Sequence, residues 1–254
     1  MKACVVHKPD SAEIAEEVLN FLSELRVSAE ILEDWRRAKN FDFVVSVGGD
    51  GTILRLLQFI DAKTPPIFGI NTGKVGLLTH CGIDFREHLL KAIENFETEE
   101  FMRIECVVDG KRLLALNEIA ILTAKPARMI EVRVLVDGVE VEDIRCDGML
   151  FSTPIGSTAY ALSTGGPIID PNLESILIVP VAPFKLGWKP WVVQSGRVIE
   201  VEISSEAFVV ADGHGSTSAN EESEIILRKS KAPAVFFKVE NRIGKIVEKL
   251  KLIR

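Results

Sequence analysis

The segment that carries the most structural information is Val44-Val45-Ser46-Val47-Gly48-Gly49-Asp50-Gly51-Thr52. Residues 43–47 form a continuous, mostly β-branched run, which is typical of a strand buried on both faces of a parallel sheet. Three glycines around one carboxylate follow at once, and the spacing of residues 52–60 then predicts a helix. A buried strand that turns directly into a helix indicates an α/β layer fold.

The segments on either side repeat this alternation of strand and helix. Short apolar runs predict strands at residues 3–6 and 66–70, and amphipathic spacing predicts helices at residues 11–25 and 84–96. Consecutive units of this kind pack with right-handed crossovers. We therefore expect an α/β N-terminal domain, a parallel sheet with flanking helices, over residues 1–97.

The pattern changes near residue 99, where apolar residues begin to alternate with polar ones. Turn dipeptides recur in this half of the chain, and they are hairpin signals between strands. The dipeptides are Asp109-Gly110, Asp137-Gly138, Ser195-Gly196 and Asp212-Gly213, and the expected strands include residues 133–136, 139–141, 149–153, 198–203 and 208–210. We expect a predominantly β C-terminal domain over residues 98–240. Residues 243–253 have helical spacing, so segment 241–254 is a candidate to pack back on the first domain.

Composition excludes several classes of function. The net charge of −7 and the absence of a Lys/Arg run argue against a nucleic acid or an anionic membrane as partner. No segment approaches the roughly 18 apolar residues of a membrane span, and no secretory signal opens the chain, so we expect a cytoplasmic protein. The four cysteines and four histidines show no ligand spacing, which argues against a structural metal or a disulfide framework.

The glycine turn at residues 48–51 has the chemistry of a phosphate site. Glycine lets backbone N–H groups approach a bulky anion, and the N-terminus of the following helix adds partial positive charge. Asp50 is therefore expected to hold Mg²⁺ or to take a proton from an attacking hydroxyl. The alternative is a tight turn in which Asp50 or Thr52 merely caps the helix. The turn is neither a Walker A loop nor a Rossmann fingerprint, and Arg55 is either a phosphate ligand or a solvated helix charge.

Two further polar blocks follow strands. Asn71-Thr72-Gly73-Lys74-Val75-Gly76 comes after the strand at residues 66–70, so it belongs to the same sheet edge as the glycine turn. Asn117-Glu118 interrupts the apolar run at residues 113–122. An Asn-Glu pair can hydrogen-bond ribose hydroxyls or an adenine amino group. The alternatives are a plain polar loop for the first block and edge-strand polarity for the second.

The longest motif runs from residue 145 to residue 167. It reads Arg145-Cys146-Asp147-Gly148, continues as the strand at residues 149–153, and ends in Pro154-Ile155-Gly156-Ser157-Thr158-Ala159-Tyr160-Ala161-Leu162-Ser163-Thr164-Gly165-Gly166-Pro167. Small side chains expose backbone amides, and Ser and Thr add donors without bulk, which suits a flat base and a sugar. Tyr160 either stacks on a base or fills the core.

Together these blocks resemble the NAD kinase family, and the match covers nearly the whole chain in order. The family's GGDG turn corresponds to residues 48–51, its N-T-G-x-x-G block to residues 71–76, and its N-E pair to Asn117-Glu118. Its T-P-x-G-S-T-A-Y-x-x-S block corresponds to residues 153–163. Lipid kinases of the diacylglycerol and sphingosine type and phosphofructokinases share a similar glycine turn, so the last block is the specific one.

The resemblance implies a kinase with its active site in the cleft between the two domains. It would use ATP or polyphosphate and a divalent cation, Mg²⁺ above all, to phosphorylate the adenosine 2′-hydroxyl of NAD and release NADP. Asp50 would be the general base and the one candidate metal ligand. The phosphate-binding residues would be Gly48, Gly49, Gly51, Thr52, Arg55, Asn71 and Gly73. The NAD-binding residues would be Asp50, Gly51, Asn117, Glu118, Arg145, Asp147, Ser157, Thr158, Ala159, Tyr160, Ala161, Ser163 and Ala182. The family forms homodimers or homotetramers in which a neighbouring subunit completes the site.

The chain departs from the family near Ala182-Pro183. Phe184 stands where the family often carries a histidine, and Lys189-Pro190 stands where Arg-Pro is common. The alternatives to NAD kinase are a lipid or sugar kinase that shares the glycine turn and a sensor that binds NAD(P) without turnover. A lipid kinase should show an apolar or basic membrane face, and a sensor gains nothing from a carboxylate beside phosphate.

Overall fold

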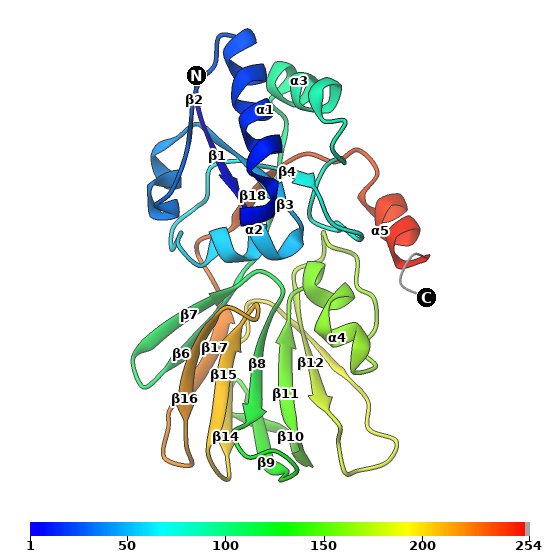
Figure 1. The fold of residues 1–254 in the computed structure, drawn as a ribbon. Coiled ribbons are helices and arrows are strands. Elements are labelled where there is room, and N and C mark those ends of the chain that lie inside the picture. Colours follow the sequence, from blue (N-terminus) through cyan, green and yellow to red (C-terminus); the bar gives the residue numbers. More distant parts are fainter. Residues whose placement is uncertain (252–254) are drawn as a thin grey trace. The chain divides into compact units, whose positions relative to one another are not determined.

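The computed structural model describes residues 1–251, and these fall into two compact units. The first unit is Met1–Glu100 together with the chain from Pro233 onward, and the second is Phe101–Ala232 (Figure 1). The sequence placed the boundaries after residues 97 and 240 instead. The difference arises because β18 (Ala234–Phe237) pairs with β4 in the sheet of the first unit. None of the helices in the described part of the chain is long and apolar enough to cross a membrane.

The first unit contains a six-stranded sheet in the order β2-β1-β3-β4-β18-β5. The pairs β1–β2, β1–β3, β3–β4 and β4–β18 are parallel, as the α/β pattern predicted. The strands predicted at residues 3–6, 43–47 and 66–70 are confirmed within one or two residues at each end. The bounds are β1 Lys2–His7, β2 Ser28–Ile31, β3 Phe43–Gly48, β4 Ile67–Asn71 and β5 Thr98–Phe101.

Helices cover both faces of this sheet. α1 (Ala12–Glu24) and α3 (Arg86–Asn95) share one core with alternate residues of β1, β3 and β4. α2 (Asp50–Leu57) lies on the other face, where Ile53 comes close to Gly69. Two 3-10 turns, η1 (Pro9–Ser11) and η2 (Trp35–Asn40), precede α1 and β3.

Two helix boundaries differ from the sequence pattern. α2 ends at Leu57 rather than residue 60, because Gln58, Phe59 and Ile60 donate to carbonyls three residues back, at 3.2, 3.0 and 3.3 Å. The C-terminal helix predicted at residues 243–253 is α5 (Arg242–Lys251), and it belongs to the first unit. Residues 252 and 253 of that prediction lie outside the described residues.

The second unit is a pair of antiparallel sheets on one shared core. The strand orders are β10-β9-β14-β17-β6-β7 and β13-β12-β11-β8-β15-β16, and the shared core takes side chains from both. This confirms the predominantly β second half. The bounds are β6 Ile104–Val108, β7 Lys111–Ala115, β8 Glu118–Thr123, β9 Ile130–Val136, β10 Val139–Cys146, β11 Gly148–Ser152, β12 Ser175–Val181, β13 Trp191–Gln194, β14 Ile199–Ile203, β15 Ala207–Ala211, β16 Gly215–Ala219 and β17 Ile225–Lys229.

Two short helical turns cover the outer face of the second of these sheets. η3 (Ile155–Thr158) and α4 (Tyr160–Ser163) follow β11 directly. Ala161 of α4 packs with Ala120, Leu150 and Leu177 in a small second core. The long motif found in the sequence is therefore a strand followed by a compact helical segment on the sheet surface.

Three of the four predicted turn dipeptides close hairpins. Asp109-Gly110, Asp137-Gly138 and Asp212-Gly213 have positive φ at both positions, as type I′ turns require. The first two are complete two-residue loops, whereas the third loop also includes His214, because Ala211 pairs with Gly215. The three dipeptides join β6 to β7, β9 to β10 and β15 to β16. The prediction for Ser195-Gly196 was wrong, because β13 and β14 on either side of it lie in different sheets. A turn dipeptide signals a reversal of the chain but does not say which strands pair.

Close backbone packing predicts the cost of one glycine substitution. A Cβ at Gly69 in β4 would lie 2.8 Å from the Cα of Thr79, a backbone atom that cannot rotate away. We expect Gly69→Ala to destabilise the protein by ~1–3 kcal/mol, the usual cost of overpacking. Urea unfolding measures it, with Gly196→Ala as the control, since a Cβ there meets nothing closer than 3.7 Å. Equal stability of the two variants would contradict the prediction.

Candidate functional site

The glycine turn joins β3 to α2 in the first unit. β3 ends at Gly48, Gly49 is the N-cap in an extended conformation, and Asp50 is the first residue of α2. Gly49 has no side chain, so the N-cap residue makes no side-chain cap hydrogen bond. The alternative interpretation of the sequence put Asp50 or Thr52 in the capping role, and neither of them occupies the N-cap position.

The carboxylate of Asp50 instead holds a neighbouring loop. Its Oδ2 accepts a hydrogen bond from the N–H of Leu77, and its Oδ1 accepts one from the N–H of Leu78, both at 2.8 Å. Two amide donors fix the plane of the carboxylate, and each oxygen keeps a second lone pair. Asp50 is thus an oriented carboxylate at the start of a helix, with capacity left to accept a proton.

Two glycines of this region are required by the local structure. A Cβ at Gly48 would collide with the side chain of Thr52. Gly76 has a φ of +73°, and a Cβ there would also collide with the side chain of Asn71. These two positions need glycine for packing or conformation, whatever binds nearby.

The other glycines of the two motifs have no such requirement. A Cβ at Gly51 would meet no atom within 4 Å, and at Gly49 and Gly73 the nearest atom would lie 4.0 and 3.5 Å away. None of the three has a positive φ. Packing within the first unit does not explain these glycines. A backbone left bare at the N-terminus of a helix suits the close approach of a phosphate group.

The Asn71 block lies beside the glycine turn, as the sequence predicted. β3 and β4 are parallel neighbours with Gly48 opposite Asn71, and the N–H of Thr72 donates to the carbonyl of Gly48 at 3.0 Å. The side chain of Asn71 bonds both the N–H and the carbonyl of Gly73, each at 3.1 Å. The carboxyl ends of the two strands thus bring both motifs to one edge of the sheet.

Arg55 has a different environment from the glycines. It lies in the last turn of α2, and its guanidinium sits 5.2 Å from the centroid of the Trp35 ring. This is a cation–π contact within the first unit.

In the second unit, a buried carboxylate holds the Asn117-Glu118 motif. The apolar run at residues 113–122 is two strands, and the chain passes from one sheet to the other between β7 and β8. Asp212 accepts hydrogen bonds at this crossing from the N–H groups of Leu116, Asn117 and Glu118, at 2.7, 2.8 and 3.1 Å. Three amides on one carboxylate fix the conformation of the crossing.

Glu118 has an unusual electrostatic environment. Its side chain is buried, and Oε2 has no hydrogen-bond partner within the described residues. Burial raises the pKa of Glu118 to about 8, the charge of Asp212 adds to the rise, and the N–H of Tyr160 opposes it. Burial also raises the pKa of Asp212 to about 6, against the effect of its amide donors. A buried polar atom without a partner indicates a position prepared for a ligand group.

The long motif packs directly on Asn117. A Cβ at Gly156 would collide with the backbone of Asn117, so glycine is required there. The N–H of Thr153 donates to the carbonyl of Asn117 at 2.8 Å, and the hydroxyl of Ser152 donates to it at 3.1 Å. The structure therefore brings the Asn-Glu motif and the start of the long motif together.

The hydroxyl groups in this motif mostly hold the loop itself. Thr153, Ser157 and Thr158 are buried and donate to the carbonyls of residues 116, 154 and 155, at 2.5, 2.6 and 3.2 Å. Ser163 is exposed at the end of α4. The buried hydroxyls thus shape the segment that precedes α4.

Tyr160 is not a core residue. Its side chain is 39% exposed at the first position of α4, while its neighbours are a half-buried Ala159 and a fully buried Ala161. Its backbone N–H interacts with the carboxylate of Glu118. The structure rules out the core alternative, because the residue is exposed, and it places the backbone of Tyr160 beside Glu118.

Three other predicted NAD-binding residues form a separate group. Asp147 donates its N–H to the carbonyl of Val181, next to Ala182, which has a φ of +48°. Arg145 lies with its guanidinium 5.5 Å from the centroid of the exposed Phe184 ring. In β11, Gly148 is paired with Val181 while Ser152 is paired with Glu118.

Gly148 and Ser152, the two ends of β11, are about 13 Å apart by strand geometry. The two groups therefore adjoin opposite ends of this strand. One group is Arg145, Asp147 and Ala182, and the other includes Glu118 and Tyr160. Within the second unit of a single chain, the structure does not bring them together.

Sequence reasoning missed the two residue sets that hold the motifs in place. The Asp212-Gly213 dipeptide indicates a hairpin, and nothing in it indicates that the carboxylate of Asp212 turns inward. The amides of Leu77 and Leu78 carry no side-chain signal at all. A buried aspartate in a hairpin loop is detectable only when its amide partners, 94 to 96 residues away, are known.

Comparison with known proteins bears directly on these motifs. Residues 27–101 match the family model of the ATP-NAD kinase N-terminal domain, and residues 116–239 match that of the ATP-NAD kinase C-terminal domain. The chain is 50% identical over 255 residues to an NAD kinase of Archaeoglobus fulgidus, with all of both chains covered. The chain belongs to the NAD kinase family.

Other members of the family are also similar to it. An NAD kinase of Methanothermobacter thermautotrophicus is 37% identical, over 95% of this chain and 92% of its own. The crystal structure of an NAD kinase from Archaeoglobus fulgidus in complex with ATP has a TM-score of 0.93, with 49% identity and full coverage of both chains. Yeast NADH kinase complexed with NADH shares the fold, with a TM-score of 0.87 at 19% identity over 99% of this chain and 87% of its own. The family resemblance and the two-domain fold class predicted from the sequence are confirmed.

The pKa of Glu118 predicts a pH-dependent stability. Its folded value of about 8 lies above the ordinary 4.5, so the folded protein binds the proton more tightly than the unfolded chain. This contribution is complete below pH 4.5 and is lost as the pH rises towards 8. We compare the free energy of unfolding of Glu118→Gln with that of the parent protein. This difference should favour the variant by on the order of 3 kcal/mol more at pH 9 than at pH 5.

Urea unfolding at the two pH values measures this difference. Glu200→Gln, at an exposed position on β14, is the matched control and should change little at either pH. A Glu118→Gln effect that is the same at pH 5 and pH 9 would contradict the buried, proton-binding environment.

Proposed function

We propose that this chain catalyses the transfer of the γ-phosphoryl group of ATP to NAD, giving NADP and ADP. The observation that carries the proposal is an oriented Asp50 beside glycines that packing does not require. It is supported by the full-length identity of 50% to a protein named NAD kinase. Phosphoryl transfer needs positioning and charge neutralisation more than covalent chemistry from the protein, and the turn supplies both.

The donor binds at the glycine turn in this proposal. The bare backbone at Gly49, Gly51 and Gly73 allows the phosphates to approach, and the N-terminus of α2 favours their negative charge. Gly48 packs against Thr52, and Asn71 packs against Gly76, so these residues fix the shape of the turn and its neighbouring loop. Arg55 packs on Trp35. Inorganic polyphosphate presents the same repeating anion, so it is a second candidate donor at this site.

Asp50 acts as the general base. It accepts the proton of the adenosine 2′-hydroxyl, whose oxygen then bonds to the γ-phosphorus while the bond to the β-phosphate oxygen breaks and ADP leaves. The amides of Leu77 and Leu78 fix the carboxylate for this role. Orientation in advance of the reaction is what makes such a base effective.

A divalent cation fits the same place. Mg²⁺ usually binds through one or two carboxylates together with substrate phosphates and waters. Asp50 at the start of α2, next to the expected phosphates, meets that requirement as a single protein carboxylate. The cation would neutralise charge on the transferred group.

NAD binds at the Asn117-Glu118 crossing and α4. The unpartnered Oε2 of Glu118 suits a ribose hydroxyl, and the exposed ring of Tyr160 suits stacking on a base. Asn117 is held beside them by Asp212. The small residues around Tyr160 differ in exposure: Ser157, Thr158 and Ala161 are buried, whereas Ala159 is half-buried and Ser163 is exposed.

A second copy of the chain completes the NAD site. Asp147 and Ala182 adjoin the pair Gly148–Val181, whereas Glu118 pairs with Ser152 at the other end of β11, about 13 Å from Gly148 by strand geometry. We therefore propose a homodimer or homotetramer in which Arg145, Asp147 and Ala182 come from the neighbouring subunit. The free thiols of Cys4, Cys81, Cys106 and Cys146 suit the reducing cytoplasm as the compartment.

Replacing the base tests the function. Asp50→Asn should lower turnover by ~10² or more while NAD still binds, because an amide cannot accept the proton. NADP is measured with an NADP-specific dehydrogenase after incubation with NAD, ATP and Mg²⁺, and then with polyphosphate. Asp61→Asn, an exposed aspartate after α2, is the control. Full activity in Asp50→Asn would refute its role, and binding of NAD without NADP in the parent protein would identify a sensor.

Replacing the exposed ring tests the acceptor site. Tyr160→Ala should weaken NAD binding about tenfold, the loss expected for one stacking contact, while Tyr160→Phe should keep it. Calorimetric titration with NAD measures both variants. An unchanged dissociation constant in Tyr160→Ala would show that the base binds elsewhere.

A further inference from the structure

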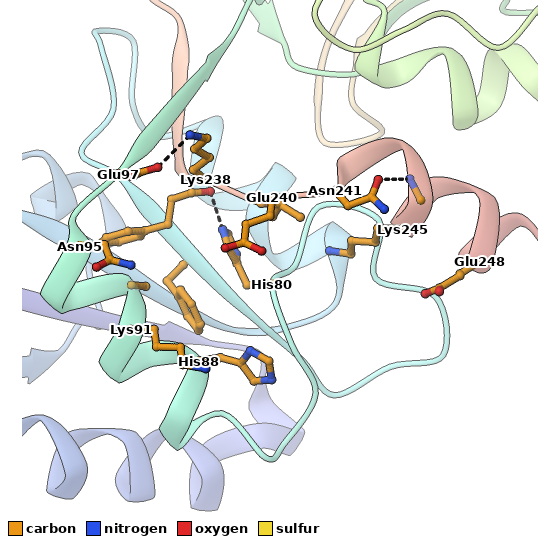
Figure 2. A pocket seen from close by; sticks show the side chains of 15 residues that line it. His80, His88, Lys91, Asn95, Glu97, Lys238, Glu240, Asn241, Lys245 and Glu248 are labelled. Carbon is orange, nitrogen blue, oxygen red and sulfur yellow. Dashed lines mark hydrogen bonds and ion pairs between the residues drawn. The ribbon is translucent and has the colours of Figure 1, made fainter.

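A pocket of about 550 Å³ lies in the first unit, and the proposed reaction does not use it. Its walls are α3, the chain that follows β18, and α5, as Figure 2 shows. His80 and the buried Phe68 and Phe237 are among its lining residues. The volume is in the range of small-molecule sites.

The lining residues Phe68, His80 and Phe237 carry no charge, because two are phenylalanines and His80 is neutral. The Nδ1 atom of His80 accepts a hydrogen bond from the N–H of Gly69 at 2.9 Å, and Nε2 donates to the carbonyl of Phe237 at 2.8 Å. The ring also stacks on Phe68, with centroids 4.6 Å apart. Burial lowers the pKa of His80 to about 3. His80 is therefore a neutral wall residue rather than a cation available to a ligand.

Two of the cations on the rim already have partners. Lys238 is paired with Glu97 at 2.8 Å, and Lys91 is paired with Glu87 at 2.6 Å (Figure 2 shows the first pair). Both pairs are exposed to solvent, where such pairs contribute little energy. Because a glutamate neutralises each of these two lysines, neither offers a free positive charge to a ligand.

Lys245 is different from these rim lysines. It comes from the second turn of α5, and its Nζ is buried without a hydrogen-bond partner among the described residues. Burial lowers the pKa of Lys245 to about 8, the charge of Arg242 lowers it further, and Asp50 opposes the shift. An ammonium group that is buried without a partner is unfavourable, because it has lost water contacts and gained no protein contacts in return. A bound anion would supply the missing partner and would not have to displace another one.

We propose that this pocket binds a small organic anion, with Lys245 as its anchor. Lys245 is a half-buried residue that lines the pocket, so rotation about its side-chain bonds would bring Nζ to the ligand. Glu240 and Glu248 also line the pocket, and they disfavour a ligand with several anionic groups, such as a nucleoside triphosphate. The ligand class is a metabolite with a single carboxylate or phosphate group.

The pocket has a physical connection to the glycine turn. His80 and Cys81 end the same loop whose Leu77 and Leu78 amides hold the carboxylate of Asp50. Lys245 acts electrostatically on both His80 and Asp50. A bound anion would neutralise the charge of Lys245 and so weaken its electrostatic effect on Asp50. The pocket would thereby regulate the activity of Asp50. This consequence rests on the proposed function, whereas the binding itself does not.

Amide NMR titration tests the binding without any turnover. The ¹⁵N-labelled full chain is titrated with sodium acetate and, separately, with inorganic phosphate at constant ionic strength. We expect saturable shifts at Asn95, Gly244 and Lys245 with at least one of the two anions. Shifts at Gly49 and Gly51 report anion binding at the glycine turn and are followed in the same spectra.

Two variants make the assignment specific. Lys245→Met should weaken the anion at the pocket about tenfold or more, as expected for loss of a charged hydrogen-bond partner. Anion-induced shifts of the Gly49 and Gly51 amides should be the same in Lys245→Met as in the parent protein, which shows that the variant is folded. Lys251→Met, an exposed charge change at the end of the same helix, should match the parent protein. No saturable pocket shift with either anion, or equal affinity in Lys245→Met, would overturn the proposal.

Discussion

A carboxylate that accepts consecutive peptide N–H groups organises the motifs in each unit. Asp50 holds residues 77–78, and Asp212 holds residues 116–118. In both cases one short acidic side chain fixes a segment that has no regular structure of its own. Amide donors to a carboxylate are charge-assisted hydrogen bonds, roughly twice as strong as neutral ones. The conformation of the loop beside the glycine turn and that of the crossing between the two β-sheets depend on these contacts.

The glycines of the two units fall into two groups with different roles. Gly69 and Gly156 lie where another backbone passes too close for a Cβ, so they are fixed by packing alone. Gly49, Gly51 and Gly73 have room for a side chain and ordinary φ values. The distinction separates glycines that build the fold from glycines that leave space for a ligand. It places the second kind around Asp50, where a phosphate site is proposed.

Local signals in the sequence were enough for much of the fold and for the motifs. The buried strand before Gly48, the hairpin at Asp137-Gly138 and the order of the blocks all depend on residues that are neighbours in the chain. Long-range pairing was not accessible in this way. β18 returns to the first sheet after the whole second unit, and the partner amides of Asp212 lie about ninety residues away. That Asp147 and Glu118 adjoin opposite ends of β11 likewise appears only once the strand register is known, because motif order does not show which ends of strands meet.

The central claim is that a phosphoryl group passes to the adenosine 2′-hydroxyl of NAD. Phosphorus NMR of the product formed from NAD, ATP and Mg²⁺ tests this most directly, since it reports both the new phosphate and the hydroxyl that carries it. The account predicts one added phosphomonoester resonance, coupled to the 2′ proton of the adenosine ribose, in equal amount to ADP. Two results would contradict this claim: NAD that stays unchanged with ATP and also with polyphosphate, or a product that carries the phosphate on another hydroxyl.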